Sequence, residues 1–184
     1  YLFLTKINDI NYCFYIDKKI STGHQYPRII SVKYRFDDDL YSDTLLDGEL
    51  VRYNNTNWLF LINNIHLYKT TKTNNLDIFQ KIKKLESIFE NEYTKDINID
   101  ICNIQIIKYF APCKIDTFIN EFIPSLPYKC KGIYFTPINK KYANLLYIFN
   151  NDNIYKSNVS SKKDTYDDLI TNINNVNSSN KEKL

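Results

Sequence analysis

The stretch Leu45-Leu46-Asp47-Gly48-Glu49-Leu50-Val51 sets one of the chain's three glycines between two carboxylates in an apolar frame. Glycine permits backbone conformations that other residues resist, so the pattern predicts a tight bend where a strand meets a polar site. The carboxylates of Asp47 and Glu49 can accept hydrogen bonds from a ribose or approach a bound cation. Asp-Gly is also a common signal of a type I′ hairpin, and an Asp before Gly often bonds its own backbone. A binding site and a plain turn are therefore both open.

The composition allows one domain with a sizeable core. The chain has 184 residues, of which 43% are hydrophobic and 15% aromatic. Its net charge of +3 is too small to indicate nucleic-acid binding by charge alone. Four cysteines without a Cys-x-x-Cys pair predict reduced thiols in an intracellular setting, and two histidines make structural zinc an unattractive interpretation. No apolar run approaches the ~20 residues that cross a bilayer, so we expect no membrane partner.

Alternating apolar runs and turn signals predict an α+β fold. In the first 70 residues, Asn8-Asp9, Thr22-Gly23 and Asn54-Asn55 separate at least four antiparallel strands. Apolar residues at three- and four-residue spacing predict the longest helix from Asp77 to about Tyr93.

The second half of the chain is expected to hold shorter elements. We expect a strand over 104–110, followed by a helix over 116–122 that is capped by Asp116 and closed before Pro124. Two further strands are expected over 133–135 and 145–149. Residues 150–184 are polar, which predicts a weakly ordered tail with a helical turn at 166–173.

Several segments stand in an informative order. Apolar runs at 1–5 and 12–17 are typical of a hairpin, Asp47-Gly48-Glu49 follows, and strand-like runs cover 58–68 and 106–110. Next comes Lys131-Gly132-Ile133-Tyr134-Phe135-Thr136-Pro137. In this order the segments resemble the motifs of the covalent nucleotidyltransferases, and within them the mRNA capping guanylyltransferases, whose corresponding motif also ends in Phe-Thr-Pro. The resemblance covers residues 1–149.

The resemblance implies the antiparallel-sheet nucleotidyltransferase core, of the ATP-grasp-like, DNA ligase and capping enzyme kind, without an oligonucleotide-binding barrel in this chain. In the family, a Lys-x-Asp-Gly-x-Arg motif with the nucleophilic lysine directly precedes the hairpin. We therefore expect that lysine just upstream of Tyr1 and no catalytic residue within the chain. The absence of methionine and the first residue, Tyr1, indicate a fragment or a trimmed domain.

By the same resemblance, eight residues are expected to bind nucleotide: Asp47, Gly48, Glu49, Phe60, Asn64, Lys108, Lys131 and Gly132. Glu49 is also the expected metal ligand. Phe60, or Trp58 in its place, would stack on the guanine base, although core packing explains either ring equally well. Plain alternatives exist for the others too, since Glu49, Lys108 and the pair Lys140-Lys141 can be solvated surface charges.

Two departures from the family pattern concern catalysis. A carboxylate precedes the glycine of the Gly-Leu-Ile-Phe motif in active members, where it helps to position a divalent metal, and this chain has Lys131 there. The family's Lys-x-Lys strand is replaced by the wholly apolar run at 145–149. An ammonium cannot ligate Mg²⁺, but it can bind phosphate. This combination also resembles the noncatalytic cap-binding domain of snurportin.

Two functions follow from these resemblances. As a guanylyltransferase, the domain would move GMP from GTP to a diphosphate RNA 5′ end through a lysyl-GMP intermediate, with Mg²⁺ or Mn²⁺. As a noncatalytic relative, it would bind a guanine nucleotide or an RNA cap. A ligase relative or an unrelated α+β domain are the remaining interpretations. We expect other capping domains in the full protein, a cytoplasmic location with viral factory or virion as alternatives, and, from the richness in Asn, Ile, Lys and Tyr, an AT-rich genome such as that of a large DNA virus.

Overall fold

The structure is a computed structural model that describes residues 1–53, 57–138 and 143–149. The predicted tail, its helical turn, the Asn54-Asn55 turn and the pair Lys140-Lys141 lie outside these residues. The chain divides into two compact units, one formed by Tyr1–Lys108 with Tyr134–Leu145 and the other by Tyr109–Ile133 with Leu146–Leu184. Its class is α+β, with a mostly antiparallel sheet and few helices, as predicted.

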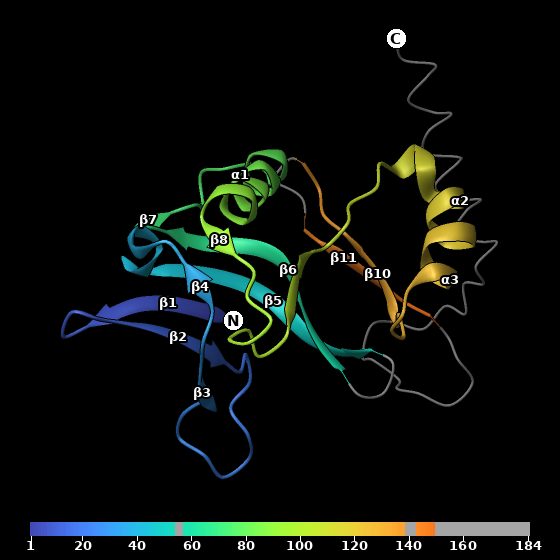
Figure 1. The fold of residues 1–184 in the computed structure, drawn as a ribbon. Coiled ribbons are helices and arrows are strands. Elements are labelled where there is room, and N and C mark those ends of the chain that lie inside the picture. Colours follow the sequence, from blue (N-terminus) through green and yellow to red (C-terminus); the bar gives the residue numbers. More distant parts are fainter. Residues whose placement is uncertain (54–56, 139–142, 150–184) are drawn as a thin grey trace. The chain divides into compact units, whose positions relative to one another are not determined.

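The main sheet has seven strands in the order β3-β2-β1-β5-β6-β7, with β9 also paired to β6 (Figure 1). All pairs are antiparallel except β6 with β9. Its strands are β1 (Leu2–Ile7), β2 (Ile10–Ile16), β3 (Ile29–Val32), β5 (Thr44–Tyr53), β6 (Asn57–Tyr68), β7 (Thr71–Lys72) and β9 (Asn103–Ile106). Two further two-stranded sheets join β4 (Arg35–Phe36) to β8 (Tyr93–Thr94) and β10 (Gly132–Phe135) to β11 (Leu145–Ile148).

Residues with positive φ make the tight turns of this sheet. Asn8 and Asp9 have φ of 50° and 61° and connect β1 to β2, which confirms the turn predicted there. Lys69 and Thr70, with φ of 47° and 65°, connect β6 to β7 in the same way. Two consecutive residues with positive φ match the right-handed twist of the strands that they connect.

The helix α1 (Ile78–Asn91) agrees with the sequence prediction to within two residues. Asp77 caps it: the Gln80 amide donates to Asp77 Oδ1 at 2.8 Å, and the Asp77 amide donates to Gln80 Oε1 at 2.9 Å. This reciprocal pair satisfies two amides that a helix start otherwise leaves without partners. The apolar face of α1 buries Leu85 and Ile88 in the core.

The core lies between α1 and one face of the sheet. Fully buried side chains from β1, β5, β6 and α1 meet there, together with aromatic rings that precede β5. Its members include Leu2, Leu4, Tyr34, Phe36, Leu40, Leu46, Phe60, Ile62, Ile65, Leu85 and Ile88. All four cysteines are free, and two of them, Cys13 and Cys102, are core residues.

The second half of the chain differs from the prediction in two places. The strand expected over 104–110 ends at Ile106, as β9. The helix expected over 116–122 is part of a longer helical segment of mixed type, which runs from Pro112 through α2 (Ile115–Thr117) and a π-helical turn to α3 (Ile123–Ser125). Asp116 is therefore inside the segment and is not its cap. The segment begins earlier because the fixed φ of Pro112 suits a first helical turn.

Candidate functional site

The tripeptide Asp47-Gly48-Glu49 lies in the middle of β5, so neither the bend nor the hairpin turn expected from its sequence forms. The irregularity near this tripeptide lies in β6, the strand that pairs with β5. Asp47 pairs with Asn64 but Gly48 pairs with Ile62, and the pairing of β5 with β6 shifts at this point. One residue of β6 is therefore extra here, which is the signature of a β-bulge. A second shift lies between Leu45 and Leu46.

Gly48 is required by close approach and not by backbone conformation, because its φ is not positive. A Cβ at this position would lie far inside the van der Waals distance of the Leu61 carbonyl oxygen and 2.8 Å from Cζ of Phe60. The Phe60 ring thus packs directly against the glycine. Any larger residue would push the two strands apart.

Strand alternation places the two carboxylates of the motif on one face of β5. Leu46 and Gly48 are buried toward the core, so Asp47 and Glu49 project from the opposite face. The extra residues are in β6 and leave the alternation of β5 intact. Asp47 is half-buried and Glu49 is exposed.

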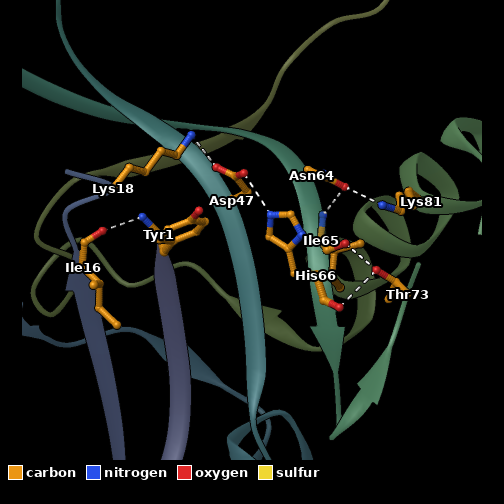
Figure 2. Close-up of polar contacts among 9 residues, drawn as sticks. All are labelled: Tyr1, Ile16, Lys18, Asp47, Asn64, Ile65, His66, Thr73 and Lys81. Carbon is orange, nitrogen blue, oxygen red and sulfur yellow. Dashed lines mark hydrogen bonds and ion pairs between the residues drawn. The ribbon is translucent and has the colours of Figure 1, made fainter. Parts of the chain in front are cut away.

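Asp47 is the centre of a polar cluster formed by three strands or strand ends (Figure 2). Its Oδ1 lies 2.5 Å from Nζ of Lys18, which follows β2, and its Oδ2 lies 3.0 Å from Nε2 of His66 on β6. Burial by itself raises the pKa of the Asp47 carboxyl, but the His66 hydrogen bond and the Lys18 ammonium together outweigh it and lower the pKa. Asp47 thus binds side chains from β6 and from the segment after β2, and does not stabilise a turn.

Tyr1 borders this cluster. Its ring meets the His66 imidazole edge to face, with centroids 5.9 Å apart, and Nζ of Lys18 lies 5.7 Å from its centroid. The backbone nitrogen of Tyr1 donates to the Ile16 carbonyl at 2.8 Å, which continues the pairing of β1 with β2 (Figure 2). An aromatic ring, two cationic or ionisable groups and a carboxylate therefore share one face of the sheet.

Hydrogen bonds hold the irregular part of β6 in place. Asn64 Oδ1 accepts from the Ile65 amide at 2.9 Å and from Nζ of Lys81 on α1 at 3.0 Å. The buried hydroxyl of Thr73 donates to the carbonyls of Ile65 and His66, at 2.5 and 3.3 Å (Figure 2). Asn64, an expected nucleotide ligand, is thus tied to α1 and has its oxygen engaged within the fold.

The two candidate stacking rings have different positions. Phe60 is only 2% exposed and packs on Tyr15, with ring centroids 4.8 Å apart. Its ring has no face available to a base, so the structure places it in the core, as the alternative interpretation held. Trp58 is 42% exposed, and the Arg52 guanidinium lies 4.7 Å from its ring centroid.

The remaining predicted ligands lie elsewhere in the chain. Lys108 is exposed and follows β9. It belongs to the same unit as Asp47 and ends the segment Tyr1–Lys108 of that unit. Lys131 and Gly132 belong to the other unit, where the Phe149 amide donates to the Lys131 carbonyl at 3.0 Å. A Cβ on Gly132 would collide with the Tyr147 carbonyl oxygen of β11, so this glycine too is required by strand contact. The side chain of Lys131 is exposed.

Two members of the Asp47 cluster, Lys18 and His66, were not predicted. Lys18 comes two residues after an apolar strand, a common position for a solvated lysine, and carries no motif. His66 is one of only two histidines, which is the one sequence signal that could have drawn attention to it. Its approach to Asp47 depends on the bulge in β6, and no residue spacing indicates that bulge.

The comparisons add no family assignment. A scan against protein-family models finds no match, and a search of curated proteins finds no detectably similar sequence. What the fold defines is the class, an α+β domain with a mostly antiparallel sheet. Among the helices of the described residues, none has the length and apolarity needed to traverse a bilayer.

Proposed function

We propose that this chain is a guanylyltransferase-like domain of the mRNA capping type, which binds GTP on the sheet face that carries Asp47 and Glu49. In this proposal GMP is transferred to a diphosphate RNA 5′ end through a lysyl-GMP intermediate. One observation carries it: two carboxylates of one short motif project from the same face of a central strand, away from the core, beside Lys18 and His66. Such a face offers both acceptors and donors to a nucleotide.

The order of the elements supports the proposal. A hairpin of β1 and β2 comes first, then β5 with Asp47-Gly48-Glu49, then β6, the helix α1, the segment with Lys108 that follows β9, and finally β10 with Gly132. This is the order in which the motifs of the covalent nucleotidyltransferases follow one another. A chance Asp-Gly-Glu in an unrelated domain would not need the same succession of hairpin, strand pair, helix and strand.

In this proposal the residues of the cluster have distinct roles. The side chain of Glu49 is exposed, and among the described residues it has no ion pair or hydrogen bond, so its carboxylate is free to accept from ribose hydroxyls. Lys18 supplies a cation that Asp47 holds in position. Tyr1 supplies an aromatic face beside them.

A divalent metal fits these residues only to a limited degree. Among the described residues, no group of three or more His, Cys, Asp or Glu side chains is positioned to hold a metal ion. Mg²⁺ on a nucleotide needs only one or two carboxylates, because phosphate and water supply its other ligands. Glu49 is the residue that would hold it. When bound, Mg²⁺ or Mn²⁺ would offset the negative charge of the triphosphate.

A noncatalytic function is the second candidate, and Lys131 is the observation that favours it. An exposed ammonium stands where active relatives have a metal-binding carboxylate. A lysine there would bind phosphate or a cap without assisting a metal. The domain would then recognise a guanine nucleotide or an RNA cap.

A labelling assay and a binding measurement together separate the two candidates. The chain, together with any residues that precede Tyr1 in its natural protein, is incubated with α-labelled GTP and Mg²⁺ or Mn²⁺ and run on a denaturing gel. A band that survives boiling in detergent but is lost in mild acid identifies a lysyl-GMP adduct and establishes catalysis. Binding of GTP or of capped RNA by the folded protein without such a band establishes the noncatalytic function. Failure to bind either ligand contradicts both.

A further inference from the structure

We infer that Arg52 and Trp58 form a stacking site for single-stranded RNA at the far end of the β5–β6 hairpin. The choice of RNA as the partner rests on the proposed function. The two residues are directly opposite in the register of β5 and β6, and the Arg52 guanidinium lies 4.7 Å from the Trp58 ring centroid. A guanidinium over an indole is a flat, cationic platform of the kind on which bases stack.

The platform is exposed because it lies past the last layer of the core. Leu50 pairs with Phe60 and Arg52 pairs with Trp58, so these four side chains share one face of the two strands. Phe60 is buried, whereas Leu50 is 46% and Trp58 42% exposed. An apolar patch thus continues the core face of the hairpin into solvent. Core packing, which explains Phe60, does not explain an indole in this position.

The local charge fits a polyanion. Within residues 50–60 of the sequence, Arg52 is the one charged residue. Among the described residues it forms no ion pair, and the nearest carboxylate in sequence, Glu49, projects from the other face of β5. The guanidinium can therefore donate to phosphate oxygens while it stays over the indole ring. An acidic peptide would satisfy the charge but would make less use of the flat surface, which favours RNA.

The single tryptophan of the chain makes the site directly measurable. A ten-nucleotide unstructured RNA is titrated into the protein at low salt while the fluorescence of Trp58 is recorded. We expect saturable quenching, because a base that stacks on the pair changes the surroundings of the indole. With labelled RNA and anisotropy as the readout, Trp58→Ala should weaken binding by about tenfold, from the usual energy of one base stack. Arg52→Lys, which keeps the charge but not the plane, should weaken it several-fold.

Phe79→Ala is the matched control, because it removes an exposed aromatic ring from α1, away from the proposed site. The Phe79→Ala protein should bind RNA with the same affinity as the unmodified chain. Equal RNA binding by Trp58→Ala and the unmodified chain would overturn the inference. So would the absence of quenching, or quenching by a glutamate-rich peptide as strong as that by RNA.

GTP binding is measured on the same proteins to keep the two proposals apart. Quenching by RNA without any binding of GTP would refute the proposed function and leave the stacking site in place. Binding of GTP that is unchanged in Trp58→Ala, without quenching by RNA, would refute the stacking site alone.

Discussion

The imidazole Nε2 of His66 lies 3.0 Å from Oδ2 of Asp47, although His66 has no register partner on β5. Leu45 pairs with Leu67 and Leu46 pairs with Ile65, so His66 is the extra residue of a bulge in β6. A bulge re-aims the side chain that it carries. Here the bulge in β6 brings the His66 side chain to the carboxylate of Asp47, which also binds Lys18.

Acid should weaken the fold through Asp47. The folded-state pKa of this carboxyl lies below its ordinary value of 3.8, because the His66 hydrogen bond and Lys18 outweigh the effect of burial. The stabilisation is therefore fully present above pH 3.8 and is lost as the pH falls through the lower folded value. Urea unfolding at pH 7 and pH 3 should show a smaller acid loss in Asp47→Asn than in the unmodified chain. Glu49→Gln removes a neighbouring carboxylate as a control, and identical acid losses in all three proteins would refute this linkage.

Gly48→Ala should destabilise the protein by about 1–3 kcal/mol, the usual effect of overpacking. The added methyl group meets a backbone carbonyl of Leu61, which cannot move as a flexible side chain can. The free energy of unfolding in urea measures the effect. Glu49→Ala, at the exposed next residue, should change stability by no more than about 0.5 kcal/mol. A stable Gly48→Ala protein would mean that β5 and β6 are farther apart at this point.

Phe60→Ala and Trp58→Ala should differ sharply in stability. Removal of the buried Phe60 ring should cost roughly 3–5 kcal/mol, since it leaves a cavity in the core. Removal of the exposed Trp58 ring should cost about 1 kcal/mol or less, mainly through its contact with Arg52. Thermal unfolding followed by circular dichroism compares them. The opposite ranking would place Trp58 in the core and remove the basis of the stacking site.

Asp77→Ala should lower stability by about 1 kcal/mol, because it removes the carboxylate that accepts from the Gln80 amide, whereas the backbone amide at position 77 can still donate to Gln80 Oε1. Asp116→Ala should have almost no effect, since Asp116 is exposed inside a helical segment and caps nothing. Chemical unfolding of both variants is the measurement. Equal losses would show that the second helical segment begins at Asp116, as its sequence predicted.

The regular elements could be predicted because their signals are local. The spacing of Ile78, Leu85 and Phe89 indicates α1, and Asn8-Asp9 indicates the first turn. The site could be predicted only in part. Asp47 and Glu49 follow from strand alternation once β5 is known, whereas the partners of Asp47 come from other strands through a bulge. The sequence of β5 alone does not show which residues of other strands will contact Asp47.

Gly48 illustrates why a correct residue can be given a wrong reason. Its position directly after Asp47 indicated a turn, and glycine is indeed common in turns. What requires the glycine is instead the close approach of the Leu61 backbone and the Phe60 ring to Gly48. These two residues are on β6 and come near Gly48 only because β6 pairs with β5. Pairing of this kind depends on register, which the tripeptide does not contain.

The central claim is that the face carrying Asp47 and Glu49 binds a guanine nucleotide, and calorimetric titration of the folded chain with GTP tests it most directly. We predict saturable binding of GTP that exceeds binding of ATP. Glu49→Gln should weaken it about 10- to 100-fold, the usual cost of losing a hydrogen bond to a charged group. Glu86→Gln, at an exposed carboxylate on α1, should leave it unchanged. No binding of GTP, or equal binding by Glu49→Gln and the unmodified chain, would contradict the account.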